Sequence, residues 1–417
     1  MTRTLPLALY GAATGLLEPF APAVLRGRAG RGKEDAARLG ERLGRPGAAR
    51  PDGPLVWLHG VSVGETMSLL PLVSALRAHR PELALLVTSG TVTAAAMMAG
   101  HLPAGVIHQF APVDAPGAVR RFLGHWRPDA GVFVESELWP NLILAARAQG
   151  VRLSLISARM TEGSAARWSR WPGSARALVA AFQVLAAQDA ATEARLARLG
   201  GRPGPRLNLK LVGEPLPFDA AELERLRTAA AGRKVVLAAS THPGEEAIVA
   251  RAFHDAAPNL GEALLVIAPR HPDRGPALAD ELHATRRAAG EAPTGAIHIA
   301  DTLGELGLFF RLADIVVMGG GFVPGIGGHN PLEPARLGRP ILTGPHAFNA
   351  AEAYAGLFAE AAAIEAPDAA ALTRHIRGLL DNPAIVRRMG EAALAYAGRQ
   401  NAAVMQRALT LLDPLLP

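Results

Sequence analysis

The chain has 417 residues, of which 49% are hydrophobic and none is cysteine. Its length predicts two globular domains, and the lack of cysteine excludes disulfides, thiolate nucleophiles and thiolate zinc ligands. The net charge of +6 is concentrated in the first 210 residues, and the remainder of the chain is acidic. We therefore expect the first half of the chain to face something anionic.

An apolar stretch runs from Leu5 to Leu25, and a basic segment, residues 26–50, follows it. The stretch is long enough to span a bilayer, yet it contains Glu18 and three prolines, so it can span, lie in the interface or be a cleaved signal peptide. The basic segment has no aromatic residue, which argues against nucleic-acid binding and indicates an anionic membrane surface. We predict a membrane anchor or interfacial segment at residues 1–27, with the rest of the chain in the cytoplasm by the positive-inside rule.

Short runs rich in β-forming residues alternate with helical patterns, which predicts two parallel sheets covered by helices. The first set comprises Leu55–Val61, Ala84–Ser89, Val106–Val113, Ala130–Glu135, Arg152–Ala158, Phe182–Ala187 and Leu209–Gly213. The second set comprises Val235–Ser240, Ala263–Ala268, Ala296–Ala300, Asp314–Gly319, Pro340–Gly344 and Ala361–Ile364. The same α/β architecture is therefore expected twice.

The segment Gly213-Glu214-Pro215-Leu216-Pro217 interrupts regular structure between the two sets. We expect a first domain at residues 28–213, a link at 214–232 and a second domain at 233–417. Doubly wound domains bind ligands at the carboxyl ends of their strands, so a cleft between the domains is the predicted site. The sequence shows no Walker-type loop, no metal-ligand spacing among its histidines and no Asp-x-Asp triplet, so we expect neither ATP hydrolysis nor a metal.

The first candidate residue is Glu65, in the turn between the first predicted strand and the helix after it. A carboxylate at the ligand edge of a sheet can take a proton from an acceptor hydroxyl. The pattern Ser62-x-x-Glu65 is also a capping box, in which the carboxylate binds a backbone N–H at the helix start. The sequence leaves both interpretations open.

Two further carboxylates, Glu135 and Glu137, come at the end of another buried strand of the same sheet. Charges are costly to bury, so carboxylates beside an apolar run need partners or a function. The alternative is that one of them is an acid that favours the start of the following helix. We predict that at least one is functional, and the sequence does not choose between them.

In the predicted second domain, Gly319-Gly320-Gly321 follows a strand, and the run Gly325–Pro334 leads into a helix. Glycines let a ligand approach the backbone, and a helix N-terminus offers free N–H groups to a phosphate. Glu333, near the helix start, is suited to accepting hydrogen bonds from ribose hydroxyls. Capping is the alternative, with Asn330 at the N-cap, Pro331 at N1 and Glu333 at N3, although capping does not require so many glycines.

A cation, Arg270, follows Pro269 at the end of a further strand of the second set. It is placed to pair with a phosphate, although a surface arginine after a strand is common. The segment Ser240–Glu246 has the same placement and is equally compatible with a simple helix cap.

Together these motifs resemble the 3-deoxy-D-manno-octulosonic acid (Kdo) transferases that act on lipid A precursors. The resemblance covers nearly the whole chain, and its most specific part is Gly328-His329-Asn330-Pro331-Leu332-Glu333-Pro334-Ala335. The other matching segments are residues 40–44, 59–66, 135–141, 208–210, 240–246, 269–271 and 344–349. The resemblance implies a GT-B fold, in which two Rossmann-like doubly wound domains face a central cleft. It also implies that the first domain binds the acceptor and the second binds the CMP-sugar.

The resemblance further implies an inverting glycosyltransferase that moves Kdo from CMP-Kdo onto lipid IVA in lipopolysaccharide biosynthesis, without a cofactor. Glu65 then acts as general base, and Glu135 and Lys210 match positions that stabilise the transition state. The positions that match CMP-binding residues are Pro269, Arg270, Gly320, Gly321, Asn330, Pro331, Leu332 and Glu333. One arginine and a helix N-terminus can meet the charge of a monophosphate leaving group without a metal.

Two positions depart from the family pattern. Phe322 stands where typical members carry a small hydroxyl residue, and Arg206-Leu207-Asn208-Leu209-Lys210 replaces a motif usually written Thr-Gly-Asn-x-Lys. The expected partners are the donor, the lipid acceptor and anionic lipids of the inner membrane on its cytoplasmic face. The alternatives are another GT-B enzyme, such as a nucleotide-sugar epimerase, and a catalytically silent membrane scaffold.

Overall fold

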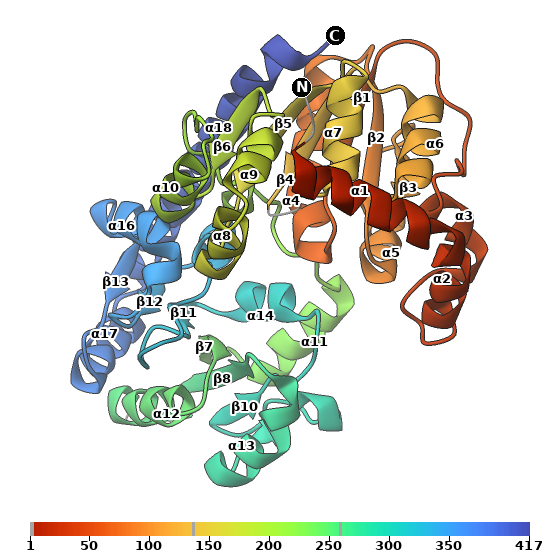
Figure 1. Cartoon of the computed structure of the whole chain (residues 1–417). Coiled ribbons are helices and arrows are strands. Elements are labelled where there is room, and N and C mark those ends of the chain that lie inside the picture. The colour runs from red at the N-terminus through yellow and green to blue at the C-terminus, as the bar shows by residue number, and fades with distance from the viewer. Residues whose placement is uncertain (1–3, 136–137, 258–260) are drawn as a thin grey trace. The chain divides into compact units, whose positions relative to one another are not determined.

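A computed structural model describes residues 4–135, 138–257 and 261–417. The chain forms two compact α/β units, each with its own parallel sheet (Figure 1). The first unit runs to Gly213 and also includes Asn401–Pro417, and the second unit is Glu214–Gln400.

The sheet of the first unit has six parallel strands in the order β3-β2-β1-β4-β5-β6. Their bounds are β1 Leu55–His59, β2 Ala84–Ser89, β3 Ile107–Phe110, β4 Ala130–Val134, β5 Arg152–Ala158 and β6 Val184–Ala187. All five residues of β1 and of β4 are buried, as expected for strands that have helices on both faces. The strand order reverses between β1 and β4, so the ligand edge of this doubly wound sheet lies at their carboxyl ends.

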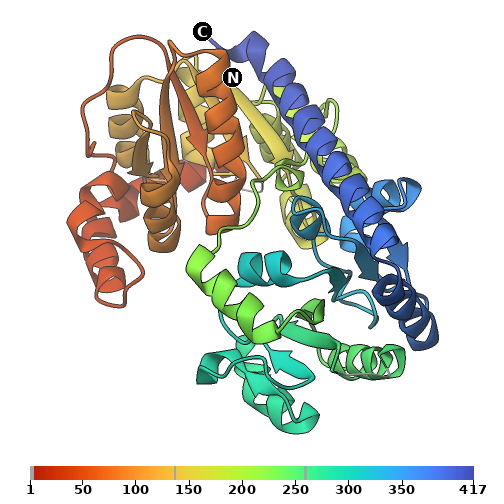
Figure 2. The same ribbon diagram turned by 180° about the vertical axis from the view of Figure 1, so that it is seen from behind.

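Helices cover both faces of this sheet, because successive side chains of a strand point to opposite faces. Leu55 and Trp57 of β1 lie in one core with α6 to α10, whereas Val56 and Leu58 lie in the other with α4, α5 and the end of α18. The helices are α4 Val63–His79, α5 Val92–His101, α6 Pro116–Trp126, α7 Pro140–Ala148, α8 Glu162–Ser169, α9 Pro172–Val179, α10 Ala190–Arg198 and α18 Pro383–Leu412. Figure 2 shows the C-terminal end of α18 beside the first unit's sheet.

The N-terminal apolar stretch is helical and lies against the first unit. It consists of α1 Leu5–Leu17, a 3-10 turn Glu18–Phe20 and α2 Ala21–Ala29, and a 3-10 turn Ala36–Arg38 and α3 Leu39–Arg42 follow. Residues Leu5–Ala29 are long and apolar enough to cross a membrane. The Tyr10 hydroxyl nevertheless donates to Asp114 Oδ2 at 3.0 Å, and the Gly117 amide donates to Glu18 Oε2 at 2.7 Å.

The sheet of the second unit has seven parallel strands in the order β13-β12-β11-β7-β8-β10-β9. Their bounds are β7 Lys234–Thr241, β8 Ala263–Pro269, β9 Thr285–Arg286, β10 Ile297–Ile299, β11 Ile315–Met318, β12 Ile341–Thr343 and β13 Ala363–Glu365. The chain passes from β7 to β8 and later returns to pair β11 on the other side of β7. The switch point of this sheet therefore lies at the carboxyl ends of β7 and β11.

Helices cover both faces of the second sheet as well. Helices α12, α13 and α17 contribute to one core, and α14 lies on the other face (Figure 1). The helices are α11 Ala220–Ala230, α12 Glu245–Ala256, α13 Gly275–Leu282, α14 Leu306–Leu312, α15 Leu332–Ala335, α16 Ala351–Ala359 and α17 Ala369–Asp381. Further 3-10 turns of this unit are Pro272–Arg274, Arg287–Ala289 and Phe348–Ala350, and one more, Asp413–Leu415, belongs to the first unit.

Two expectations from the sequence are wrong. The predicted strand Leu209–Gly213 is instead a 3-10 turn, Leu209–Leu211, because the Asn208 side chain accepts from the Lys210 amide at 3.0 Å and turns the backbone. The second domain was predicted at 233–417, but the second unit is Glu214–Gln400, so both predicted boundaries lie too far toward the C-terminus. Residues 401–417 return to the first unit, and residues 214–232 form part of the second unit rather than a separate link.

Candidate functional site

Glu65 lies in the first turn of α4, directly after β1. Its Oε2 accepts from the Val61 amide at 2.7 Å, and its Oε1 accepts from the Ser62 hydroxyl at 2.7 Å. Ser62 is the N-cap of α4 and its hydroxyl accepts from the Glu65 amide, so Glu65 caps the helix start as expected, although it binds the Val61 amide in place of the Ser62 amide of a regular capping box. Each carboxylate oxygen can accept a second hydrogen bond, so capping leaves Glu65 able to accept from a hydroxyl.

Glu135 follows β4, the neighbour of β1 at the switch point. Its backbone is in the left-handed region with φ of 61°, a conformation that costs about 1–3 kcal/mol for a residue other than glycine and that gathers at functional sites. The Glu135 carboxylate is buried, and Lys210 Nζ lies 2.5 Å from its Oε1. Glu137, the other carboxylate proposed from the sequence, lies outside the described residues.

Lys210 reaches Glu135 because the turn Leu209–Leu211 packs against the end of β5. The Leu209 amide donates to Ser157 Oγ at 3.2 Å. Ser157 itself has φ of 50°, at a register shift between β5 and β6. The pairing of Lys210 with Glu135 thus depends on an irregular strand end that carries no recognisable sequence pattern.

In the second unit, Gly319-Gly320-Gly321 follows β11 in a space that excludes side chains. A Cβ at Gly319 would lie 2.5 Å from the Ser240 carbonyl oxygen, and one at Gly321 would lie 2.7 Å from Thr343 Oγ1. Gly320 has φ of 76°. Close packing of two loops at the switch point therefore accounts for these glycines.

The buried carboxylate of Glu245 holds this glycine loop. Its Oε2 accepts from the Gly320 amide at 2.7 Å and from the His242 amide at 2.9 Å, and its Oε1 accepts from the Phe322 amide at 2.8 Å. The amide of Gly320 is thus occupied by the protein, whereas the sequence analysis expected glycine backbone to be open to a ligand. Within the predicted segment Ser240–Glu246, the role of Glu245 was not apparent from the sequence.

The helix expected after Asn330 is short. Helix α15 has four residues, and its N-cap is Pro331 rather than Asn330. The Asn330 Oδ1 instead accepts from the Leu332 amide at 3.1 Å. The Leu332 side chain is fully buried, its amide is bound by Asn330 and its carbonyl oxygen accepts from the Arg336 amide, so Leu332 supports the helix start from within the protein.

Glu333 is partly buried near the cation proposed for phosphate. Burial raises the pKa of the Glu333 carboxyl, and Arg336, Arg270 and the Asn330 side chain oppose that rise. Because the Arg270 charge acts on the Glu333 carboxyl, Glu333 lies near the carboxyl end of β8. The structure thus places Glu333, Asn330 and Arg270 in one neighbourhood.

Two histidines from separate loops also meet here. The His242 and His329 rings stack with centroids 5.1 Å apart and an angle of 5°, and their Nε2 atoms are 2.9 Å apart. Burial, then His242 and Arg270, lowers the pKa of His329 to about 4. The sequence analysis weighed these histidines only as metal ligands and missed their pairing.

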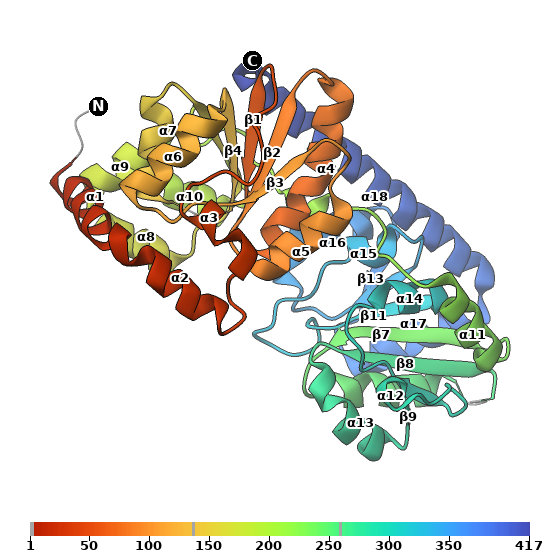
Figure 3. The same cartoon turned by 90° about the vertical axis from the view of Figure 1, so that its right-hand side faces the viewer.

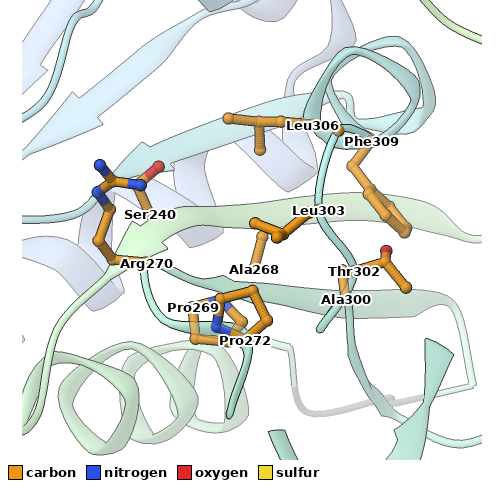
Figure 4. A pocket seen from close by; sticks show the side chains of 11 residues that line it. Ser240, Ala268, Pro269, Arg270, Pro272, Ala300, Thr302, Leu303, Leu306 and Phe309 are labelled. Carbon is orange, nitrogen blue, oxygen red and sulfur yellow. The ribbon is translucent and has the colours of Figure 1, made fainter. Parts of the chain in front are cut away.

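A pocket of about 170 Å³ opens at the carboxyl ends of β7, β8 and β10 (Figure 4). Arg270 and Ser240 line one end, and Leu306 and Phe309 of α14 line the opposite part. Pro269, the last residue of β8, also lines it. The pocket joins a cation to an apolar enclosure, as needed for a phosphate attached to a flat ring.

The segment after β10 was missed as a contributor to this pocket. Thr302, Leu303 and Gly304 line it. Their position in the sequence could have indicated this role, because loops after parallel strands gather at one edge of the sheet. A strand was predicted at 296–300, but no site residue was predicted in the loop after it.

Comparison with known proteins identifies the family. Residues 37–214 match the family model described as 3-deoxy-D-manno-octulosonic-acid transferase. The chain is 37% identical to the 3-deoxy-D-manno-octulosonic acid transferase of Bordetella pertussis over 90% of this chain and 91% of that protein. The chain belongs to the Kdo transferase family. The Kdo transferase of Rickettsia bellii is 33% identical over 93% of this chain and 94% of its own.

Solved structures show the fold of this transferase more widely. A glycosyltransferase from Rickettsia africae aligns with a TM-score of 0.61 at 9% identity, over 88% of this chain and 99% of that chain. The UDP-GlcNAc 2-epimerase of Neisseria meningitidis aligns with a TM-score of 0.55 at 15% identity, over 86% of this chain and 100% of that chain. These likenesses confirm the predicted GT-B class of α/β fold, and the family relationship makes the chain a glycosyltransferase rather than an epimerase.

Proposed function

We propose that this transferase moves Kdo from CMP-Kdo, with inversion, onto a hydroxyl of the lipid A precursor lipid IVA. The observation that carries the donor assignment is Arg270 at one end of the 170 Å³ pocket in the second unit. A nucleoside monophosphate has one charged group and one flat base, which match the two ends of that pocket. Family membership supports Kdo as the sugar.

The second unit supplies the remaining donor contacts in this proposal. Glu333 accepts hydrogen bonds from the ribose hydroxyls, and Asn330 lies beside it at the start of α15. Arg270 neutralises the phosphate as it leaves with the electron pair of the broken C–O bond. Glu245 keeps the glycine loop in place through its three amide contacts.

The first unit supplies the groups for the acceptor. Glu65 takes the proton of the attacking hydroxyl as the new C–O bond forms at the anomeric carbon. The positive charge that develops on the sugar ring in the transition state is stabilised by the Glu135 carboxylate, and Lys210 holds that carboxylate and faces anionic groups of the reactants. The 2.5 Å contact between Lys210 and Glu135 supports their acting as one unit.

We also propose that the N-terminal helices lie in the membrane interface on the cytoplasmic face instead of spanning the bilayer. One side of α1 is held by polar contacts: Tyr10 donates to Asp114, and Asn141 donates to Thr14 Oγ1 at 2.9 Å. Moving α1 across the hydrocarbon would break these contacts and would carry the polar groups of Tyr10 and Thr14 into an apolar medium. The other side exposes large apolar residues, including Leu5 at 72% and Leu16 at 77%, which suits an interfacial helix.

The test is a transfer assay with the purified full chain, CMP-Kdo and lipid IVA in mixed micelles. We expect release of CMP in proportion to a Kdo-bearing lipid identified by mass spectrometry. A chain that binds CMP but transfers no Kdo would contradict the proposal and favour the catalytically silent scaffold. Release of CMP without a change in the lipid would mean that lipid IVA is not the acceptor.

A further inference from the structure

The exposed large hydrophobic side chains of the first unit gather in one place. Among the described residues of this unit, all but one of them lie within residues 5–24 of the N-terminal helices. The remaining one is Trp171, which is 56% exposed. A large aromatic side chain left in solvent needs an explanation when the rest of the unit buries its own.

Trp171 lies beside the start of the N-terminal helices. It immediately precedes α9, and the Ser174 hydroxyl of α9 is 2.6 Å from the Thr4 hydroxyl. A Cβ on Gly173 would lie 3.5 Å from Thr4 Cγ2. Figure 3 shows the first turn of α1 next to α9. The turn between α8 and α9 therefore lies beside the N-terminal end of α1.

Cations without carboxylate partners flank this surface at both ends. Arg167 is exposed in the last turn of α8, and Arg170 is exposed in the turn before Trp171. At the opposite end, Arg26 and Arg31 are exposed at and beyond the end of α2. Within the described part of the chain, none of these four arginines is in an ion pair with a carboxylate, although Arg28 between them pairs with Glu34.

A tryptophan side chain has an apolar ring and a polar N–H, so it is favoured at the boundary between lipid headgroups and hydrocarbon. Arginines beside it attract the anionic phosphates of the same boundary. The arrangement is that of a bilayer surface contact, because the apolar and cationic groups are exposed within five consecutive residues. A soluble protein partner would more often meet a surface with few unpaired cations at its centre.

We propose that residues 167–171, the end of α8 and the turn before α9, are a second point of contact with an anionic phospholipid bilayer. Trp171 inserts at headgroup level, and Arg167 and Arg170 bind lipid phosphates. Two separate contacts, this turn and the N-terminal helices, fix the rotation of the unit about the axis of α1, which one helix alone cannot do. The proposal depends on the interfacial attachment proposed above.

Tryptophan quenching tests the insertion. The full chain is added to vesicles of phosphatidylglycerol and phosphatidylcholine whose acyl chains are brominated near the headgroup. Trp57 and Trp126 are fully buried, and Trp139 and Trp168 are partly buried against the same core. We therefore expect wild-type fluorescence to be quenched, and Trp171→Phe to lose most of the quenching while still sedimenting with the vesicles. Equal quenching in both proteins would overturn the second contact and leave the attachment intact. Failure of both proteins to sediment would overturn both proposals.

A charge reversal tests the arginines. Arg167→Glu with Arg170→Glu should weaken binding to anionic vesicles at least tenfold, because two cations near an anionic surface are replaced by anions. The matched control reverses Arg251 and Arg387, two exposed arginines of the second unit in long, exposed ion pairs, with the same change in net charge. We expect a loss below twofold for the control. Equal losses would show that only net charge matters and would overturn the proposal.

Discussion

The Glu65 carboxylate caps a helix and still has lone pairs that can accept a hydrogen bond from a substrate hydroxyl. Both of its carboxylate oxygens accept hydrogen bonds within the turn Val61–Ser62, each at 2.7 Å. Such contacts fix the rotamer and the direction of the remaining lone pairs. A general base benefits from this fixation, because proton transfer requires hydrogen-bond geometry with the substrate hydroxyl. The capping contacts therefore do not argue against the proposed role.

The first prediction concerns Glu65→Gln. The amide keeps the shape of the side chain and can still accept from the Val61 amide, but it cannot take a proton. We expect kcat to fall by a factor of about 10² to 10⁴, with a fall in stability of about 1 kcal/mol or less. The measurements are single-turnover transfer rates and thermal unfolding midpoints.

Ser62→Ala is the matched control for that substitution. It removes the N-cap hydroxyl and its contact with Glu65, but it leaves the carboxylate. We expect a similar or larger loss of stability, near 1 kcal/mol, with transfer retained within about tenfold of wild type. If Glu65→Gln were as active as Ser62→Ala, Glu65 would be a capping residue only.

Buried histidines make the stability of the protein depend on pH. Burial is the main cause that lowers the pKa to about 3 for His59 and to about 4 for His108, His298 and His329. In the unfolded chain these groups take up protons near pH 6.5. As pH falls from 7 to 5, the unfolded state therefore gains protons that the folded state does not, and the free energy of unfolding decreases.

The second prediction is that thermal unfolding midpoints fall steadily from pH 7 to pH 5. Each such histidine adds a slope of at most about 1.4 kcal/mol per pH unit, and Glu333, whose pKa is raised by burial, acts in the opposite direction. His298→Gln should flatten the dependence, whereas the exposed His254 changed to Gln should not. A midpoint that rises as pH is lowered over this range would contradict the prediction. Calorimetry at several pH values gives the slopes.

At the scale of elements, irregular strand ends position the candidate residues of each unit. Glu135 after β4, Ser157 in β5 and Ser240 in β7 all have positive φ, at 61°, 50° and 57°. Each lies at the carboxyl end of its strand, where the ladder gives way to a loop that faces ligands. The regular strands determine where the ligand edge of each sheet lies, and the residues with positive φ determine the direction of the side chains at that edge.

The third prediction concerns Glu245→Gln. A carboxylate accepts all three amides from His242, Gly320 and Phe322, but a glutamine amide would present N–H groups to at least one N–H donor. We expect the glycine loop to shift and the Kd for CMP to rise about tenfold, a loss of about 1.4 kcal/mol. Isothermal titration of the full chain with CMP measures the change.

Asp368→Ala is the control within the same unit. The Asp368 side chain caps α17 by accepting from the Ala371 amide at 2.7 Å, so its loss should cost about 1 kcal/mol of stability. We expect CMP affinity to stay within twofold of wild type. A CMP affinity that fell equally in both variants would mean that Glu245 acts only through general stability.

At the scale of the whole molecule, α18 contributes to both units. It begins in the second unit, and residues from Asn401 onward belong to the first. Val404, Ala408 and Leu412 lie in the same core as Leu69 and the other apolar residues of α4. The first unit is therefore not a contiguous piece of sequence, and a fragment that ends at residue 213 would expose part of its core.

The fourth prediction is that Leu412→Ala destabilises the first unit by about 2–5 kcal/mol, because it creates a cavity at a fully buried position. CMP binding should persist, since its proposed residues lie within Glu214–Gln400. Leu394→Ala, at a half-exposed position of the same helix, should cost less than about 0.5 kcal/mol. Denaturant unfolding and CMP titration distinguish the two, and equal costs would contradict the assignment of the C-terminal residues to the first core.

The sequence by itself determined the two parallel sheets and the strand ends that carry Glu65, Glu135 and Arg270, because buried strands read as apolar runs and their ligand edge follows from strand direction. It also determined the family, through motifs distributed over the whole chain. Apolar runs and short motifs depend only on residues that are close in the sequence, so they can be recognised before the tertiary structure is known.

Only the tertiary structure decided which distant residues meet. The contact of Lys210 with Glu135, the stack of His242 on His329 and the hold of Glu245 on the glycine loop all join separate loops. The return of residues 401–417 to the first unit is of the same kind. Such contacts depend on loop paths and packing between elements, and neither periodicity nor composition specifies them.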